Sequence, residues 1–111
     1  MQVQSYVLKA TSKFQDLINR FDNSTHREID SSIMKLANDP YSNTKPLKGR
    51  YYGRRSLRIG KIRVIFAICE ECRKLGALLR KDSKCVDCDE ESDKTVKLFY
   101  VGFRETVYDS L

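Results

Sequence analysis

Apolar residues in the first third of the chain recur at helical spacing, in two groups that each follow a capping-box pattern, Ser12-x-x-Gln15 and Thr25-x-x-Glu28. A first helix is therefore predicted over about 12–21, and a second from Thr25 onward. The second should end at Asn38-Asp39-Pro40, because proline cannot continue a helix and restricts the residue before it. The apolar stripes consist of Phe14, Leu17, Ile18 and Phe21 in the first helix and of Ile29, Ile33, Leu36 and Ala37 in the second.

The other apolar segments have the character of β-strands. They cover 3–10, 51–59, 62–68 and 94–102. The dipeptide Gly60-Lys61 joins the middle two, and a glycine in its first position is what a type II′ hairpin turn requires. The order β-α-α-β-β-β predicts one α+β domain over 1–111, with an antiparallel-rich sheet packed against two N-terminal helices. Residues 69–88 are predicted to form a small hairpin inserted before the last strand.

The two-residue turn also predicts how the hairpin strands pair, with Ile59 opposite Ile62 and Arg58 opposite Arg63. Because side chains alternate across a sheet, one face should be the core under the helices, and the other should carry arginines. The core face would consist of Leu57, Ile59, Ile62, Val64 and Phe66, and the opposite face, called here the arginine face, of Arg54, Ser56, Arg58 and Arg63. Opposed like charges destabilise a strand pair. An anion between the arginines would remove that penalty.

Charge and composition narrow the choice of partner. The chain has 111 residues, which favours a single domain, and 41% of them are hydrophobic, which excludes global disorder. Its formal net charge is +6, and the segment from Lys45 to Arg63 contains no acid, so a polyanionic partner is expected. The alternative is a solvated basic face paired with the acidic stretch at 82–93. No apolar run is long enough for a membrane span or a signal peptide, so a cytoplasmic protein without membrane association is predicted.

Four cysteines lie in the insert, as Cys69-x-x-Cys72 and Cys85-x-x-Cys88. Two such pairs supply four thiolates that can close tetrahedrally around Zn²⁺, as in a zinc ribbon. Because four cysteines leave no open coordination position, the zinc would be structural, and it would order an insert too small to fold by apolar burial alone. A pair of disulfides, in a protein from a hyperthermophile, or an iron centre are the alternatives.

The segments LKGRYYGRRSLRIGKIRVIFAI and VKLFYVGFRETVY resemble the second half of the RelE/ParE toxin superfamily. The shared elements are Leu47-x-Gly49, Leu57-Arg58-x-Gly60, Arg63-Val64-Ile65-Phe66, Val101-Gly102 and Arg104-x-x-x-Tyr108. The predicted order of helices and strands agrees, and only the cysteine insert lies outside the likeness.

The resemblance implies the toxin of a type II toxin–antitoxin pair, held inactive by an acidic antitoxin. RelE-type members cut mRNA on the ribosome by attack of a ribose 2′-hydroxyl on the adjacent phosphate, whereas ParE-type members poison DNA gyrase. By this resemblance Arg63 and Arg104 would stabilise the phosphate, and Tyr108 would stack on a base or transfer a proton. The RNA-binding positions would be Lys48, Arg54 and Arg58.

Two positions depart from the family pattern. Ser56 stands where the family usually has lysine or arginine, and Phe103 precedes Arg104 where many members have histidine. The one histidine, His26, is predicted at the surface near the start of the second helix. These losses leave two other functions open: a gyrase-inhibiting or degenerate, non-catalytic member, and a zinc-ribbon module that binds RNA.

Overall fold

The computed structural model describes residues 6–48, 53–75 and 94–103. Their elements are β1 (Val7–Ala10), α1 (Ser12–Ile18), α2 (Asn23–Leu36), β2 (Thr44–Pro46), β3 (Arg55–Ile59), β4 (Ile62–Ile68), α3 (Cys69–Leu75) and β5 (Thr95–Phe103). The strands form a five-stranded sheet in the order β1-β5-β4-β3-β2. Only β1 and β5 pair in parallel, so the predicted α+β class and antiparallel-rich sheet are confirmed for these residues.

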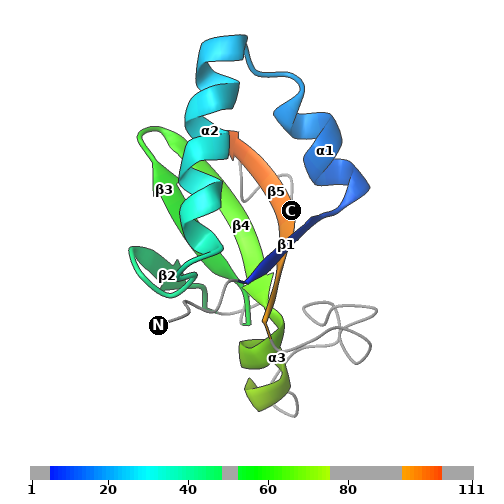
Figure 1. Cartoon of the computed structure of the whole chain (residues 1–111), viewed down its shortest axis with the longest axis vertical. Coiled ribbons are helices and arrows are strands. Elements are labelled where there is room, and N and C mark those ends of the chain that lie inside the picture. Colours follow the sequence, from blue (N-terminus) through cyan, green and yellow to red (C-terminus); the bar gives the residue numbers. More distant parts are fainter. Residues whose placement is uncertain (1–5, 49–52, 76–93, 104–111) are drawn as a thin grey trace.

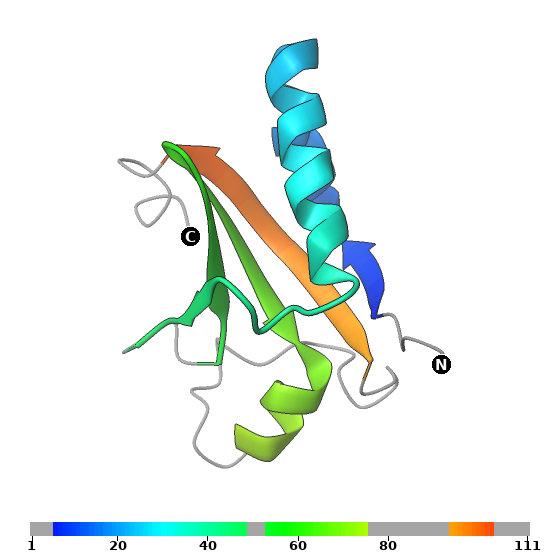
Figure 2. The same cartoon turned by 60° about the vertical axis from the view of Figure 1, so that its left-hand side comes forward.

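The helices α1 and α2 lie on one face of the sheet, and α3 lies beyond the end of β4 (Figures 1 and 2). The predicted order lacked β2 and α3. The strand β2 has three residues and ends on Pro46 at the sheet edge, which is too short to show alternation in the sequence. The helix α3 occupies the first part of the insert, so Cys69 and Cys72 lie on a helix rather than on the predicted hairpin. Residues 76–93 are outside the described part of the chain.

The helix α1 begins at Ser12 as predicted, but its N-cap is Thr11, and α2 begins at Asn23 with Asp22 rather than Thr25 as its N-cap. The Thr11 side chain accepts a hydrogen bond from the Phe14 amide at 3.2 Å, and the Asp22 carboxylate accepts one from the Thr25 amide at 2.7 Å. These bonds satisfy amides that have no partner inside the helix. The helix α1 also ends at Ile18 rather than near Phe21, because Asp22 already caps the next helix.

The predicted register of the hairpin is confirmed, with Ile59 opposite Ile62 and Arg58 opposite Arg63. Gly60 has φ 58°, and Lys61 has no positive φ, as a type II′ turn requires. The core contains the five hairpin residues expected there, with Phe14, Ile18, Ile29, Ile33 and Leu36 from the helices above them. The core face of the hairpin is therefore as predicted.

A β-bulge interrupts the pairing of β4 with β5. Ile65 pairs with Tyr100 and Phe66 pairs with Leu98, so Phe99 is an extra residue on β5. The extra residue changes which side chains face the helices: Leu98 below the bulge and Val101 above it both lie in the core. The bulge turns Phe99 and Tyr100 away from that core.

The arginine face is less open than the sequence predicts. Ile65, Ala67, Thr95, Lys97 and Tyr100 are buried although they point away from the main core, and Ser56 is only 9% exposed. Leu17 and Leu47 pack against Ile65 and Tyr100 and form a second, smaller cluster there. Of the four residues that define the arginine face, Arg58 is exposed, Arg54 and Arg63 are half-buried, and Ser56 is buried. Among the described residues, no helix is both long and apolar enough to cross a membrane.

Candidate functional site

The exposed end of the arginine face centres on Arg58 and Arg63, which oppose one another on β3 and β4. Arg58 is exposed, and Arg63 is half-buried. The Arg63 Nη1 donates hydrogen bonds to the carbonyl oxygens of Gly60 and Ile62, each at 3.2 Å. The hairpin turn therefore holds the Arg63 guanidinium, and Arg58 is the residue opposite Arg63 on the neighbouring strand.

Arg54 lies further along the same face and has a different environment. Its Cζ is 4.2 Å from the centre of the Phe99 ring, on the β-bulge. Its Nε is buried and has no hydrogen-bond partner within the part of the chain that the structure describes. A half-buried guanidinium with an unsatisfied donor favours an acceptor beyond the described residues.

The structure describes only some of the other predicted site residues. Lys48 is exposed and follows Leu47, whose amide donates to the carbonyl oxygen of Arg54 at 2.8 Å. Arg104 and Tyr108 lie outside the described residues. Phe103, which precedes Arg104, is 53% exposed and pairs with Ile62 next to the turn.

His26 takes no part in this site. It lies on α2, on the opposite side of the sheet from the arginine face, with its Nδ1 3.0 Å from the Asp30 carboxylate. The surface position predicted for it is confirmed. Ser56 is buried, so neither residue is placed to move a proton on an RNA bound to the arginine face.

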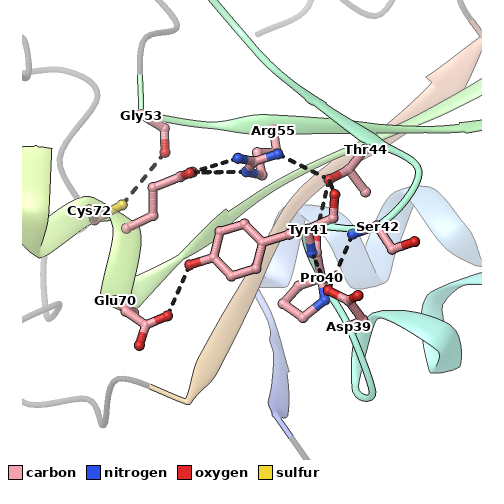
Figure 3. Close-up of polar contacts among 10 residues, drawn as sticks. Asp39, Pro40, Tyr41, Ser42, Thr44, Gly53, Arg55, Glu70 and Cys72 are labelled. Carbon is pink, nitrogen blue, oxygen red and sulfur yellow. Dashed lines mark hydrogen bonds and ion pairs between the residues drawn. The ribbon is translucent and has the colours of Figure 1, made fainter.

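A polar cluster joins α3 to β3 and to the segment before β2 (Figure 3). Arg55 donates through Nε and Nη2 to the Glu71 carboxylate, with its shortest contact at 2.8 Å. Its Nη1 also donates to the Thr44 hydroxyl at 3.3 Å. The Tyr41 hydroxyl donates to Glu70 at 3.0 Å. Burial, together with Glu70, raises the pKa of Tyr41, so this hydroxyl keeps its proton.

This cluster was not predicted from the sequence. Arg55 is one of the cations between Lys45 and Arg63, and alternation along β3 places it on the same side as Leu57. Its partner Glu71 belongs to a helix that was not expected. The alternation was an available signal for Arg55, whereas the identity of its partner depends on a long-range contact.

Two of the four cysteines predicted to bind zinc lie in the described part of the chain. Cys69 and Cys72 are both buried and lie three residues apart on α3, so they lie on one side of the helix. The Cys72 Sγ donates to the Gly53 carbonyl oxygen at 3.6 Å, a contact that zinc would replace by displacing the proton. The pair supplies half of a four-cysteine ligand set. Cys85 and Cys88 lie outside the described residues, and within the described ranges no three metal-ligating side chains gather.

An apolar groove of about 640 Å³ lies between the α1–α2 connection and the hairpin turn. Phe21, Ile59, Ile62, Val101 and Phe103 line it, and the rings of Phe21 and Phe103 lie 5.7 Å apart. Charged side chains of both signs complete the lining, namely Arg20, Asp22, Glu28 and Lys61. An apolar groove surrounded by charged side chains can bind an apolar side chain of a partner whose neighbouring residues are charged.

Comparison with known proteins gives a fold. No family model and no curated protein matches this chain. Among solved structures, it is similar to a chain of the toxin–antitoxin complex RelBE2 of Mycobacterium tuberculosis, with TM-score 0.66 and 17% identity over 93% of this chain and 95% of that one. It is also similar to the YoeB/ParE toxin of Agrobacterium tumefaciens, with TM-score 0.61 and 17% identity over 88% and 98% of the two chains.

A third similar structure is the archaeal RelE–RelB complex of Pyrococcus horikoshii, with TM-score 0.57 and 14% identity over 90% of this chain and 96% of that one. At these identities the likeness shows the fold alone. The chain therefore has the RelE-like fold that its motifs predicted, over most of the length of each of these proteins.

Proposed function

We propose that this chain is the toxin of a toxin–antitoxin pair and acts as a ribosome-dependent mRNA endonuclease. The observation that carries the proposal is the placement of Arg54, Arg58 and Arg63 on one face of a RelE-like sheet. Arg58 and Arg63 are like charges at opposed positions of the strand pair, and a phosphate bound between them would stabilise this arrangement.

The proposed reaction is attack of a ribose 2′-hydroxyl on the adjacent phosphate. It expels the 5′-oxygen and leaves a 2′,3′-cyclic phosphate and a 5′-hydroxyl. Arg63 and Arg104 stabilise the charge that develops on the phosphate, and Tyr108 stacks on a base or transfers a proton. Lys48, Arg54 and Arg58 hold the RNA backbone and contribute most of the salt-dependent affinity.

The antitoxin is proposed to be an acidic peptide that covers the arginine face and anchors apolar side chains in the groove beside it. Both surfaces meet at the hairpin turn, because Gly60 and Lys61 line the groove while Arg63 donates back to Gly60. One peptide can therefore contact both at once. One of the similar structures is named as a toxin–antitoxin complex and another as a RelE–RelB complex, which supports this partner.

A structural zinc held by Cys69, Cys72, Cys85 and Cys88 remains part of the proposal. When bound, it would supply the insert with a tetrahedral cross-link. Cys69 and Cys72 are buried on α3, which is bonded to β3 through Glu71, so the metal would stabilise α3 against the sheet.

Induced expression tests the proposal directly. It should arrest translation, and mapping of RNA ends should find mRNA with new 5′-hydroxyl ends. Arg63→Ala combined with Arg104→Ala should abolish both effects, whereas Lys9→Ala, on the exposed part of β1, should leave them intact. Full toxicity of the double variant would show that the proposed site is wrong.

One observation favours a second candidate, an RNA-binding family member without catalysis. Ser56 is buried and Phe103 replaces the histidine of many relatives, so two proton-transfer groups of the family pattern are missing. Such a protein would inhibit translation with its mRNA uncut. A DNA damage response with intact mRNA would indicate gyrase inhibition instead.

A further inference from the structure

We propose that Phe99 and Glu71 are positioning residues that hold the Arg54 guanidinium ready to bind an RNA phosphate. This inference rests on the proposed RNA-binding function and names the residues that position one of the RNA-binding arginines. Neither residue belongs to the motifs that carry the resemblance.

The Phe99 ring supports Arg54 from within the sheet. Phe99 exists as an extra residue of the β-bulge, between the pairs Ile65–Tyr100 and Phe66–Leu98. With Cζ 4.2 Å from the ring centre, the guanidinium is within the range of a cation–π contact. A ring contact restricts the side chain without using its N–H donors, so its Nη groups stay available for a phosphate although Nε is buried. Bulges are frequent beside functional sites because they redirect a side chain in this way.

The backbone of Arg54 is fixed from both sides. Its carbonyl oxygen accepts a hydrogen bond from the Leu47 amide at 2.8 Å. The residue before it, Gly53, accepts a hydrogen bond from Cys72 and has φ 101°, a conformation that favours glycine. The residue after it, Arg55, is held by Glu71 (Figure 3). Neighbouring strand residues point to opposite faces of the sheet. The helix α3 therefore binds Arg55 on one face, and the Arg54 side chain lies on the other.

The contrast between the two adjacent arginines indicates a ligand for one of them. Arg55 is satisfied by a carboxylate and a hydroxyl of its own chain. Arg54 has no acidic partner among the described residues, and its Nε has no acceptor there. A flexible arginine loses side-chain entropy when it binds, and prior restraint by the ring and by the held backbone reduces that loss.

The test uses the full chain and a short unstructured oligoribonucleotide, with affinity measured by fluorescence anisotropy at several salt concentrations. Arg54→Ala should weaken binding and lower the slope of log affinity against log salt by about 0.7, as expected for one lost contact to single-stranded RNA. Phe99→Leu should weaken binding about two- to fivefold, the size of a cation–π contact, with the slope retained because the charge remains. Phe99→Tyr keeps an aromatic ring and should restore wild-type affinity.

A double-mutant comparison separates positioning from general damage. If Phe99 and Glu71 act through Arg54, then Phe99→Leu and Glu71→Gln should have no further effect on RNA affinity in the Arg54→Ala background. Thermal unfolding of each variant confirms that it is folded at the assay temperature. Equal losses in both backgrounds, or failure of Phe99→Tyr to restore binding, would overturn the inference while RNA binding itself stands. If the unaltered chain bound no RNA, the proposed function would fail instead, and with it the basis of the inference.

Discussion

Arg55 and Glu71 form a double hydrogen-bonded ion pair whose side chains are only 13% and 18% exposed. This pair links β3 to α3 across a sequence separation of 16 residues. Such a pair is costly to break from one side, because the remaining charge stays partly buried without its partner.

Glu71→Gln should therefore lower the free energy of unfolding by about 1–3 kcal/mol, measured by urea denaturation. The matched control is Glu70→Gln on the same helix. Its partner is the neutral Tyr41 hydroxyl, and a glutamine oxygen can still accept that hydrogen bond. Equal losses for the two variants would contradict a special role for the ion pair.

The opposed arginines predict a conflict between stability and binding. Arg58→Thr should raise the free energy of unfolding by several tenths of a kcal/mol, since it removes a like charge opposite Arg63 and adds a strand-favouring residue. The same change should weaken RNA binding and reduce its salt dependence. Thermal unfolding and anisotropy titrations on one preparation check both effects. Lys35→Thr, an exposed substitution on α2, serves as a control for lost net charge.

The Asp22 cap gives the stability a defined pH dependence. Hydrogen bonds from Thr25 lower the pKa of Asp22 below its usual value of 3.8. A carboxyl whose pKa is lower in the folded state stabilises the fold above its unfolded pKa and loses that contribution as the pH falls through the folded pKa. Asp22→Asn should retain a cap but flatten the loss of stability below about pH 4. Denaturation curves at several acidic pH values measure the difference, and an unchanged pH profile would contradict the assignment.

Gly102 is predicted to resist substitution because of its neighbour on the same strand. An added Cβ at this position would lie 2.8 Å from Cε1 of Tyr100. Since the Tyr100 ring is rigid and only 5% exposed, Gly102→Ala should cost about 1–3 kcal/mol in unfolding free energy. In a Tyr100→Leu background the same substitution should cost less. Comparable costs in both backgrounds would show that the ring is not the cause.

The proposed four-cysteine site predicts the zinc content of the purified protein. Protein purified without chelator or added metal should contain one zinc ion per chain by mass spectrometry, and its removal should loosen α3 and lower the melting temperature. Cys72→Ser should reduce the zinc content, with Ser42→Ala as a control of similar size on an exposed loop. Absence of zinc, together with the mass decrease that disulfides produce, would select the oxidised alternative.

Features of the fold that depend on a short stretch of chain could be predicted from the sequence. The Gly60-Lys61 turn and the alternation of Leu57, Ile59 and Val64 determined the hairpin register and its core face, and both are confirmed. Helix starts were less certain, because Asp22 and Thr25 both have side chains able to cap and only the tertiary structure chooses between them.

Features that depend on distant segments were missed. The burial of Ile65 and Tyr100 on the arginine face depends on Leu17 and Leu47, which no local pattern brings there. The bulge at Phe99 arises from the pairing of β5 with β4, and alternation within β5 alone does not reveal it. The support beneath Arg54 was therefore invisible in the sequence, although Arg54 itself was predicted.

The strand β5 lies between β1 and β4, although it is the last described strand to be synthesised. During translation β1 has no partner in the sheet until residues 95–98 have emerged from the ribosome. Such non-local pairing is slow to form and leaves the early strand unpaired meanwhile. Phe99 arrives with the same strand, so a nascent chain lacks the ring beneath Arg54 while most of its basic segment is already made. The arginine face is thus completed only at the end of the sheet's synthesis.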